Sequence, residues 1–503
     1  MSQQLEPLAC PGLFYATSAQ DGIISRIRTP GGMLTGQQAS VVAHFAAQCG
    51  NGYVQITNRA NLQIRAVSTL PAPTLLTTLQ AAGLAAQVAR VDHLRNIMAS
   101  PTAGIDPQAL IDTRPLVQAL DDAIACHEEF ARLPAKFSVG FDGGEAVSVR
   151  ERRNDIWLVA TAGEHTGANE HPPVSFRLFL PAEHGREIDT GILLHPTECV
   201  PMVVAMAQVY LACIDRGDYS AAGKKPRLRQ VLAHQGAPWY LEQVLQLFPV
   251  AGDRQPVTVA RSASLPQRYH HLGVHPQRQQ GLSYLGMALP LGRLAAQQLQ
   301  ELAHISQVYG SGTLRLTPWQ NVLIPDVPEH RVPALQQALA SLGFPVAATH
   351  PWSALVACAG NTGCSASATN TTWHALALAN DLEQRGLLDQ PVNIHLSGCA
   401  KSCAQHHPSD IALLGISIPQ GDTTVEGYRV YVGAGEQPFG RALYDAVPAA
   451  DLPALIAHLV QVYQGHRRTS TESFGSFVKR YSSADLQRLF GCSQREHRNA
   501  EIS

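Results

Sequence analysis

The chain has 503 residues, of which 45% are hydrophobic and 15% charged, as in ordinary soluble enzymes of two to four domains. Its 37 basic and 39 acidic side chains give no overall field that would favour nucleic acid or a membrane surface, so we expect neither partner. No basic, apolar leader and no run of about 18 apolar residues is evident, and we therefore expect a cytoplasmic protein.

A repeat with an offset of 260 residues organises the chain. The segment from Pro30 aligns without gaps with the segment from Pro290, and the identities include Thr57/Thr317 and Asn61/Asn321. In each copy the sequence predicts a turn, then a helix, then a strand in which apolar and polar residues alternate. In the second copy this helix includes Leu294 and Leu299. The strands are residues 53–56 and 313–316, and further helices are expected at 74–82 and 332–342. The pattern predicts α+β units related by a pseudo-two-fold axis, with room for a ligand between them.

A second set of elements follows each copy. In the first copy we expect strands at 136–141 and 156–162, an apolar helix at 197–212, and a basic stretch that runs into a helix at 223–241. A linker is expected at 249–267.

In the second copy, residues 370–385 predict a helix that is capped by Asn370 or Thr371 and ends at Gly386, with Trp373, Leu376 and Leu382 facing inward. Strands are expected at 392–396 and 410–418, and closing helices at 449–465 and 472–490.

Four cysteines, spaced C-x5-C and C-x3-C, lie in Gly/Ser-rich loops of the second copy: Cys358, Cys364, Cys399 and Cys403. Structural zinc prefers closer pairs, disulfides require an oxidising compartment, and unrelated core thiols would not explain the two matched loops. Soft thiolates suit iron, and each iron of a 4Fe–4S cube takes one outer ligand. The spacing therefore favours a 4Fe–4S cluster.

These motifs together resemble the nitrite and sulfite reductase family. The resemblance rests on the cysteine spacing with SGC at 397–399, the duplicated half, and the RxRxPGG sequence at 26–32. Within that family the chain is most similar to the precorrin-3B synthase branch, through ACPGLF (9–14), TNRANLQIR (57–65), RNIMASPTAG (95–104) and SGCAKSC (397–403). The reductases more typically carry proline and asparagine where Ala400 and Lys401 stand.

The resemblance implies a duplicated α+β fold with two ferredoxin-like half-domains and two larger cofactor domains. The expected bounds are 1–85 and 86–248 for the first copy, and 249–345 and 346–503 for the second. The four cysteines would hold the cluster, and either sirohaem or a mononuclear non-haem iron would accompany it. In the reductases the last cysteine also bridges to sirohaem iron, and Cys403 has that position here.

A tetrapyrrole with many carboxylates requires arginine and lysine contacts. By resemblance, Arg59 and Arg95 would face the cofactor and its anionic substrate, and Lys136 matches the first of two reductase lysines, whereas Ser138 replaces the second. Other basic residues predicted to bind the tetrapyrrole are Arg26, Arg28, Arg65, Lys224, Lys225, Arg227 and Arg229. Each of them is alternatively a solvated surface group.

Two further expectations concern single residues. Copy two has Trp319 where copy one has Arg59, so we expect one copy to bind an anionic ligand while the other packs. His406 and His407 follow Cys403 and could bind iron, although neighbouring histidines rarely share one ion, whereas His395 is expected in the core.

The resemblance implies an O2-dependent enzyme that hydroxylates precorrin-3A and closes a lactone on it during cobalamin biosynthesis. NADH acting through a reductase, or ferredoxin, would supply electrons. The alternatives are a ferredoxin-dependent sulfite or nitrite reductase with sirohaem, and a non-catalytic electron carrier or tetrapyrrole-binding protein.

Overall fold

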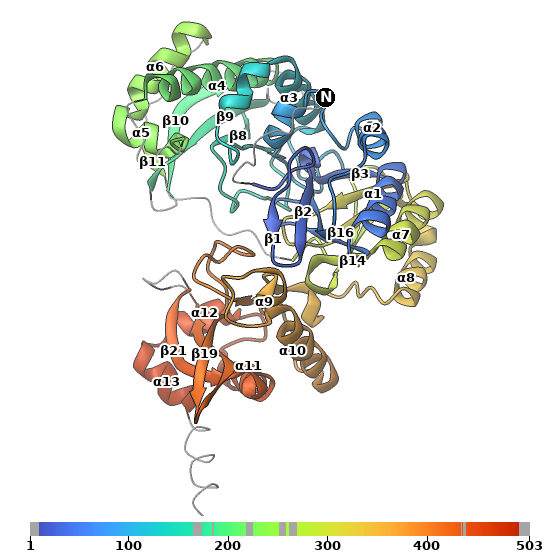
Figure 1. Cartoon of the computed structure of the whole chain (residues 1–503), viewed down its shortest axis with the longest axis vertical. Helices are drawn as coiled ribbons and strands as arrows, with labels where there is room; N and C mark the ends of the chain where they lie inside the picture. The colour runs from blue at the N-terminus through green and yellow to red at the C-terminus, as the bar shows by residue number, and fades with distance from the viewer. Residues whose placement is uncertain are drawn as a thin grey trace, which may run out of the picture.

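The computed structural model describes residues 10–163, 174–183, 186–217, 225–250, 258–260, 269–433, 435 and 439–491. Four sheets organise this part of the chain, and Figure 1 shows the two ferredoxin-like sheets side by side, with one larger domain above them and the other below. This is the duplicated α+β architecture that the repeat predicts.

The two smaller sheets exchange one strand. The first sheet has the order β1 (Ser18–Ala19), β2 (Gly22–Ile27), β5 (Leu62–Val67), β4 (Tyr53–Ile56) and β14 (Arg293–Ala295). The second has the order β12 (Gly273–Pro276), β13 (Leu282–Met287), β16 (Val322–Pro328), β15 (Thr313–Leu316) and β3 (Met33–Thr35). Leu294 of copy two pairs with Val54, and Leu34 of copy one pairs with Leu314. Each sheet therefore gains its last strand from the other copy.

One hydrophobic core lies beneath both small sheets. Its helices are α1 (Gly36–Cys49), α2 (Pro73–Ala81), α7 (Ala296–Tyr309) and α8 (Val332–Ser341), and α1 packs directly on α7. Phe45 of α1 and Leu302 of α7 are fully buried in this shared core. The helices expected at 74–82 and 332–342 are confirmed to within a residue. Leu294, expected in the helix, lies in β14 instead because the exchanged strand precedes α7.

The repeat extends to the conformation of a turn. Thr57 N donates to Asn61 O at 2.8 Å, and Asn61 N donates to Thr57 Oγ1 at 3.1 Å. Thr317 and Asn321 make the same two contacts, both at 3.0 Å. The residue before each asparagine has a positive φ, 55° at Ala60 and 65° at Gln320. The two turns therefore present their intervening side chains in equivalent positions.

The two larger sheets also match each other. The first has the order β11 (Thr258–Ala260), β10 (Glu187–Leu194), β9 (Val174–Pro181), β8 (Ile156–Ala162), β7 (Val139–Asp142) and β6 (Ile97–Met98). The second has the order β17 (Leu355–Ala357), β18 (Ile394–Ser397), β19 (Ile411–Gln420), β20 (Thr423–Val432) and β21 (Arg441–Pro448). In both, the first three strands along the chain pair in parallel and the next two join antiparallel. Part of the expected linker at 249–267 is strand β11, while 251–257 and 261–268 lie outside the described residues.

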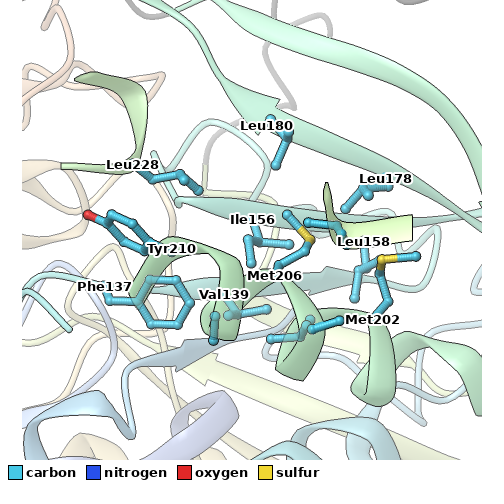
Figure 2. Packing of buried hydrophobic residues seen from close by; sticks show 14 of the residues in the cluster. Phe137, Val139, Ile156, Leu158, Leu178, Leu180, Met202, Met206, Tyr210 and Leu228 are labelled. Atoms are coloured by element: carbon cyan, nitrogen blue, oxygen red, sulfur yellow. The ribbon is translucent and has the colours of Figure 1, made fainter. Parts of the chain in front are cut away.

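Helices cover these sheets. Those of the first domain are α3 (Arg114–Cys126), α4 (Cys199–Arg216), α5 (Leu228–Gln235) and α6 (Ala237–Leu247). Those of the second are α9 (Gly360–Gly363), α10 (Thr371–Arg385), α11 (Leu452–His466), α12 (Phe474–Lys479) and α13 (Ser483–Phe490). Figure 2 shows Met202 and Met206 of α4 packed against Ile156 and Leu158 of β8. Among the described helices, Pro196–Arg216 alone has the length and composition to cross a membrane, which is weak evidence because the core helices of soluble proteins pass the same test.

Helix α10 confirms its expected caps and the inward position of Leu382, but not that of Trp373. The Asn370 side chain accepts from Trp373 N, and Gly386 ends the helix with a left-handed conformation. The expectation that Trp373 faces inward is wrong, because its side chain is 63% exposed. The buried stripe instead follows Thr371, Ala375, Leu378 and Leu382 at helical spacing, and Trp373 lies beside that stripe.

Candidate active site

A cavity of about 630 Å³ lies where the first ferredoxin-like sheet faces the C-terminal domain. The four predicted cluster cysteines all line it: Cys358, Cys364, Cys399 and Cys403. Arg26, Gln63 and Arg65 of β2 and β5 line the same cavity. The cysteines of copy two and the arginines of copy one thus share one site.

Parallel strand pairing brings the two cysteine loops together. Strand β17 pairs in parallel with β18, so both strands end at one edge of the sheet, with Cys358 directly after β17 and Cys399 two residues after the end of β18. Cys358 N donates to Leu396 O at 3.1 Å across this edge. The glycine of SGC is required by packing, since a Cβ on Gly398 would lie 1.7 Å from Ser367 Oγ.

The thiols have the surroundings of metal ligands. Gly398 N donates to Cys358 Sγ at 3.2 Å, and the Thr371 hydroxyl lies 3.4 Å from the same sulfur. Burial, followed by the charges of the other three cysteines, raises the pKa of Cys403 above its usual value. Bound iron would offset this mutual repulsion. The residues present therefore fit a 4Fe–4S cluster, in which each cysteine ligates a separate iron.

A site for one separate ion is not evident. Within the described ranges, no three His, Cys, Asp or Glu side chains gather closely enough to hold a single metal ion. His406 is exposed, and His407 contacts Arg152, as described below. His395 is buried in the core as expected, and burial lowers its pKa to about 4.

Two of the predicted tetrapyrrole-binding arginines line the cavity. Arg26 Nη2 donates to the neutral Gln63 Oε1 at 2.6 Å, while its buried Nε has no hydrogen-bond partner among the described residues. Burial, and then the neighbouring Arg28, lower the pKa of Arg26 to about 10. Arg65 instead makes a bidentate pair with Asp21 and donates to Gly363 O, so it also holds the first cysteine loop.

The other predicted arginines of copy one lie beyond the cavity. Arg28 is buried and donates to Pro11 O at 3.2 Å. Arg59 donates through all of its guanidinium nitrogens, to Asn96, Arg153 O and Asn154. Burial lowers the pKa of Arg59 to about 10, with the charge of Asp155 acting in the opposite direction.

Arg95 has a different position from the one expected for an anion-binding residue. It makes a bidentate pair with Asp121 of α3, with both distances at 2.8 Å, and also donates to Gly83 O. It is not among the described residues that line the cavity. These contacts hold α3 in place, and a catalytic role for Arg95 stays a prediction.

Lys136 and the basic run belong to the first larger domain. The exposed Lys136, together with Arg153, Arg152 and Arg59, lowers the pKa of His406 after the effect of burial, so these cations surround the loop that follows Cys403. Lys225 and Arg229 are exposed, and Lys224 lies outside the described residues.

Asp155, which the sequence reasoning missed, explains the position of Arg227. Asp155 is 3% exposed, pairs with Arg227 Nη2 at 3.1 Å and accepts from Ser138 N at 3.1 Å. Burial raises the pKa of Asp155, while Arg227 acts against this shift. The only signal in the sequence was an acidic residue just before an apolar strand.

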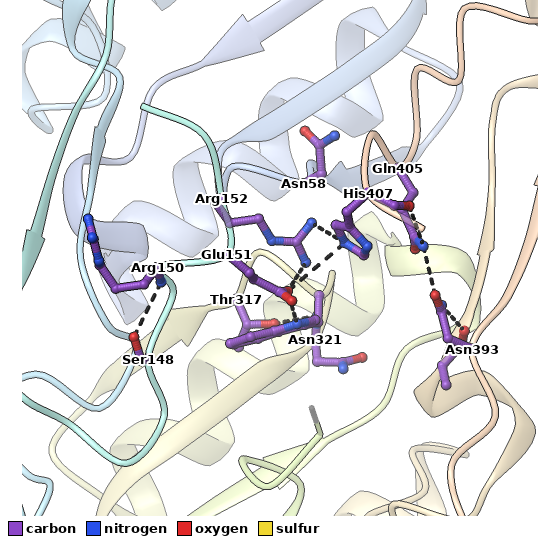
Figure 3. Close-up of polar contacts among 12 residues, drawn as sticks. Asn58, Ser148, Arg150, Glu151, Arg152, Thr317, Asn321, Asn393, Gln405 and His407 are labelled. Atoms are coloured by element: carbon purple, nitrogen blue, oxygen red, sulfur yellow. Dashed lines mark hydrogen bonds and ion pairs between the residues drawn. The ribbon is translucent and has the colours of Figure 1, made fainter. Parts of the chain in front are cut away.

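Glu151 and Arg152 were also missed. They lie in the same β7–β8 connection and reach both the second ferredoxin-like half and the cluster loop, as Figure 3 shows. They stand 206 or more positions from Cys358, and no periodicity in the sequence connects them with it.

Comparisons with known proteins agree with this geometry. The ferredoxin-like half-domain model of nitrite and sulfite reductases matches residues 17–82 and 275–342, and the 4Fe-4S domain model of the same proteins matches 90–250 and 352–491. The chain belongs to the nitrite and sulfite reductase family. It is therefore an oxidoreductase with the duplicated fold expected from its sequence, and all four cysteines lie within the second 4Fe-4S match.

Similar proteins cover most of the chain. A ferredoxin–nitrite reductase of Synechococcus elongatus is 29% identical over 475 residues, which span 89% of this chain and 88% of that protein. A chloroplastic ferredoxin–nitrite reductase of Zea mays is 29% identical over 479 residues, spanning 89% and 80%. The NirA protein of Mycobacterium tuberculosis shares the fold with a TM-score of 0.74 at 24% identity, over 92% of this chain and 84% of that chain.

Proposed function

We propose that this family member is a precorrin-3B synthase that uses O2 to hydroxylate precorrin-3A at the meso carbon between rings A and D. One oxygen atom enters the macrocycle and the other leaves as water, while the donor supplies two electrons and two protons. An acetate side chain of the substrate then closes the lactone. NADH acting through a reductase, or ferredoxin, is the proposed donor.

The observation that supports this proposal most strongly is the absence of a positive charge at Ser138, where the reductases have their second lysine. Ser138 stands there, and its N–H is directed to the buried carboxylate of Asp155, which also pairs with Arg227. A small inorganic anion that gains charge during reduction needs converging positive groups. Asp155 offsets part of the charge of Arg59 and Arg227 instead, so this side of the site is less suited to nitrite or sulfite.

The cavity wall suits a large ligand that carries its own carboxylates. Arg26 is half-buried and lines the cavity, and among the described residues its side chain is hydrogen-bonded to the neutral Gln63. A carboxylate of the tetrapyrrole would provide the charged partner that its free Nε lacks. Arg26 would thus orient the macrocycle over the cysteine loops, and the cluster, when bound, supplies single electrons.

Isotope labelling tests the reaction. Anaerobically purified protein, loaded with iron and sulfide, is incubated with precorrin-3A, a reductant and ¹⁸O2, and the product is analysed by mass spectrometry. We expect one ¹⁸O atom in the product. Label that enters only from ¹⁸O-water, or unchanged precorrin-3A with a full cluster, would overturn the proposal.

The second candidate is a ferredoxin-dependent nitrite or sulfite reductase with sirohaem, because the curated relatives quoted above are ferredoxin–nitrite reductases. In that case the same cavity would hold sirohaem as a resident cofactor instead of a tetrapyrrole substrate. A visible spectrum separates the two functions, since sirohaem gives strong banded absorption and a cluster alone a broad shoulder. Ammonia or sulfide formed from nitrite or sulfite with reduced ferredoxin would support this candidate.

A further inference from the structure

We propose that the two matched Thr-x-x-x-Asn turns, residues 57–61 and 317–321, position the loop that follows Cys403 by holding it from opposite sides. Both turns have the same internal hydrogen bonds, so they present residues 58 and 59, or 318 and 319, in equivalent places. The role concerns the 4Fe–4S domain and does not depend on the substrate proposed above.

The first turn contacts the loop directly. Asn58 Nδ2 donates to the carbonyl oxygens of Cys403, at 3.4 Å, and Ala404, at 3.2 Å. Asn58 belongs to the first ferredoxin-like half, whereas the loop belongs to the C-terminal domain, so these bonds cross between domains. They hold the backbone of the last cluster cysteine itself.

The second turn acts through an ion pair of the first larger domain. Trp319, at the position equivalent to Arg59, donates its indole Nε1–H to Glu151 Oε1 at 3.0 Å. The Glu151 side chain is only 3% exposed and lies 3.3 Å from Arg152 Nη2. Arg152 Nη1 then lies 3.0 Å from His407 Nε2. Figure 3 shows the contacts of Glu151, Arg152 and His407 converging beside the loop.

The chemistry of this contact fixes the tautomer of His407. A guanidinium can only donate, so His407 Nε2 must accept from Arg152. The ring proton is then on Nδ1, which faces Pro408 O at 3.2 Å. The orientation of this ring is therefore set by Arg152 on one side and by the loop's own backbone on the other.

The second turn can act in this way because Trp319 is buried and packed against its neighbours. Only about 10 Å³ remains between Trp319, Gln320, Arg152 and the loop residues Ala404 and Gln405. The ring of His271 stacks on Trp319 with 4.7 Å between centroids.

The backbone of the second copy closes the same slot. Gly286 stands at the position equivalent to Arg26, and a Cβ there would lie 1.8 Å from His271 O. A basic side chain like Arg26 therefore has no room in this copy. Copy one keeps a cavity beside Arg26, whereas the corresponding space in copy two is filled by residues that pack around Trp319.

The position of this loop bears on the cluster. The reduction potential of an iron–sulfur cluster depends on the solvent exposure of its sulfurs and on hydrogen bonds to them. Cys403 is an exposed residue, and Ser402 beside it has a positive φ of 52°. We therefore assign Asn58, Trp319, Glu151, Arg152 and His407 as positioning residues for Cys403.

Glu151→Gln and Trp319→Phe test this assignment. Glu151→Gln removes the charge that pairs with Arg152, and Trp319→Phe removes the indole donor but keeps a ring against His271. Losing a hydrogen bond to a buried charged group corresponds to an increase of about tenfold or more in local opening. We expect the backbone amides of residues 403–407 to exchange hydrogen faster by about that factor in the protein without iron. In the loaded protein we expect a shifted cluster potential and EPR spectrum, with iron and sulfide content retained.

Glu187→Gln is the matched control. Glu187 pairs at 2.6 Å with Arg150, which is adjacent to Glu151 in the chain, and this pair is formed away from the cluster loop. It should leave the amide exchange of residues 403–407 and the cluster potential unchanged. If Glu151→Gln leaves both quantities at the wild-type value, or if Glu187→Gln changes them equally, the assignment is wrong.

Asn58→Ala keeps the proposal testable if Glu151→Gln prevents folding. It removes only the contacts from the first turn and should likewise accelerate amide exchange of residues 403–407. Unchanged exchange in Asn58→Ala would contradict the two-sided support of the loop.

Discussion

The two copies of the repeat share a backbone and differ in what fills the space beside it. In copy one, the ferredoxin-like sheet borders a cavity of about 630 Å³ with Arg26 in its wall. In copy two, Gly286 replaces Arg26, Trp319 replaces Arg59, and about 10 Å³ remains beside the tryptophan. One copy thus borders an open cavity while the other is packed at the matching position.

Strand exchange explains why the packed copy is retained. Strand β14 of copy two completes the first sheet, and β3 of copy one completes the second. Removing either copy would leave the other with an unpaired sheet edge and an exposed half of a common core. The second copy is therefore needed for folding even where it binds no ligand.

Cys403→Ser should have the largest effect, because the four cluster cysteines all belong to copy two. It removes one thiolate of the four, so we expect loss of the 4Fe–4S cluster, measured as iron and sulfide per chain. Cys126→Ser, an exposed cysteine in the first copy, is the control and should retain the full content. Wild-type iron and sulfide in Cys403→Ser would refute the cluster assignment.

Trp319→Ala should have the next largest effect because Trp319 is 7% exposed and stacks on His271. Truncating a buried tryptophan costs about 3 kcal/mol or more in the free energy of unfolding, which urea titration measures. Trp373→Ala, at a side chain that is 63% exposed, should cost less than about 0.5 kcal/mol. Equal losses in the two variants would mean that copy two is not packed around Trp319.

Arg26→Gln tests whether the cavity beside copy one binds a tetrapyrrole. If a tetrapyrrole carboxylate binds Arg26, the variant should bind precorrin-3A about tenfold to a hundredfold more weakly, as expected for the loss of a charge-assisted hydrogen bond. Arg315→Gln is the matched control, because Arg315 is buried in the second sheet and burial likewise lowers its pKa to about 10. Titration of iron-loaded protein with the ligand, followed by absorbance, measures both. Equal weakening in the two variants would argue against a ligand in copy one.

Much of this architecture could be predicted from the sequence because its causes are local or repeated. The 260-residue offset predicted the matched strands at Tyr53–Ile56 and Thr313–Leu316, and the caps of α10 followed from Asn370 and Gly386. The cysteine spacing predicted that two loops would meet. The replacement of Arg59 by Trp319 correctly indicated that the second copy packs.

Other features depend on contacts between distant segments, which spacing does not encode. The exchange of β3 and β14 involves strands of three residues each, too short to give an alternating pattern. The pairing of Arg95 with Asp121, and of Arg227 with Asp155, depends on tertiary position, and a list of basic residues does not distinguish such pairs from ligand contacts. Trp373 shows that one apolar residue in a helix does not define its buried face.

The smallest predicted effect concerns pH and tests how completely copy two is closed. His271 is fully buried, and burial lowers its pKa to about 3 from an ordinary value of 6.5. Above pH 6.5 the ring is neutral in both folded and unfolded chains and contributes no pH dependence. Below it the unfolded chain binds a proton that the folded chain does not, so stability falls by about 1.4 kcal/mol per pH unit until pH approaches 3.

His271→Phe should remove this contribution while keeping an aromatic ring against Trp319. The loss of unfolding free energy between pH 7 and pH 5 should therefore be about 2 kcal/mol smaller in the variant than in the wild type. Urea titrations at the two pH values measure the difference, and titrations at pH 7 and pH 8 provide the internal control, since both chains should behave alike there. An unchanged loss between pH 7 and pH 5 would mean that water reaches His271 and that the second slot is open enough to admit a ligand.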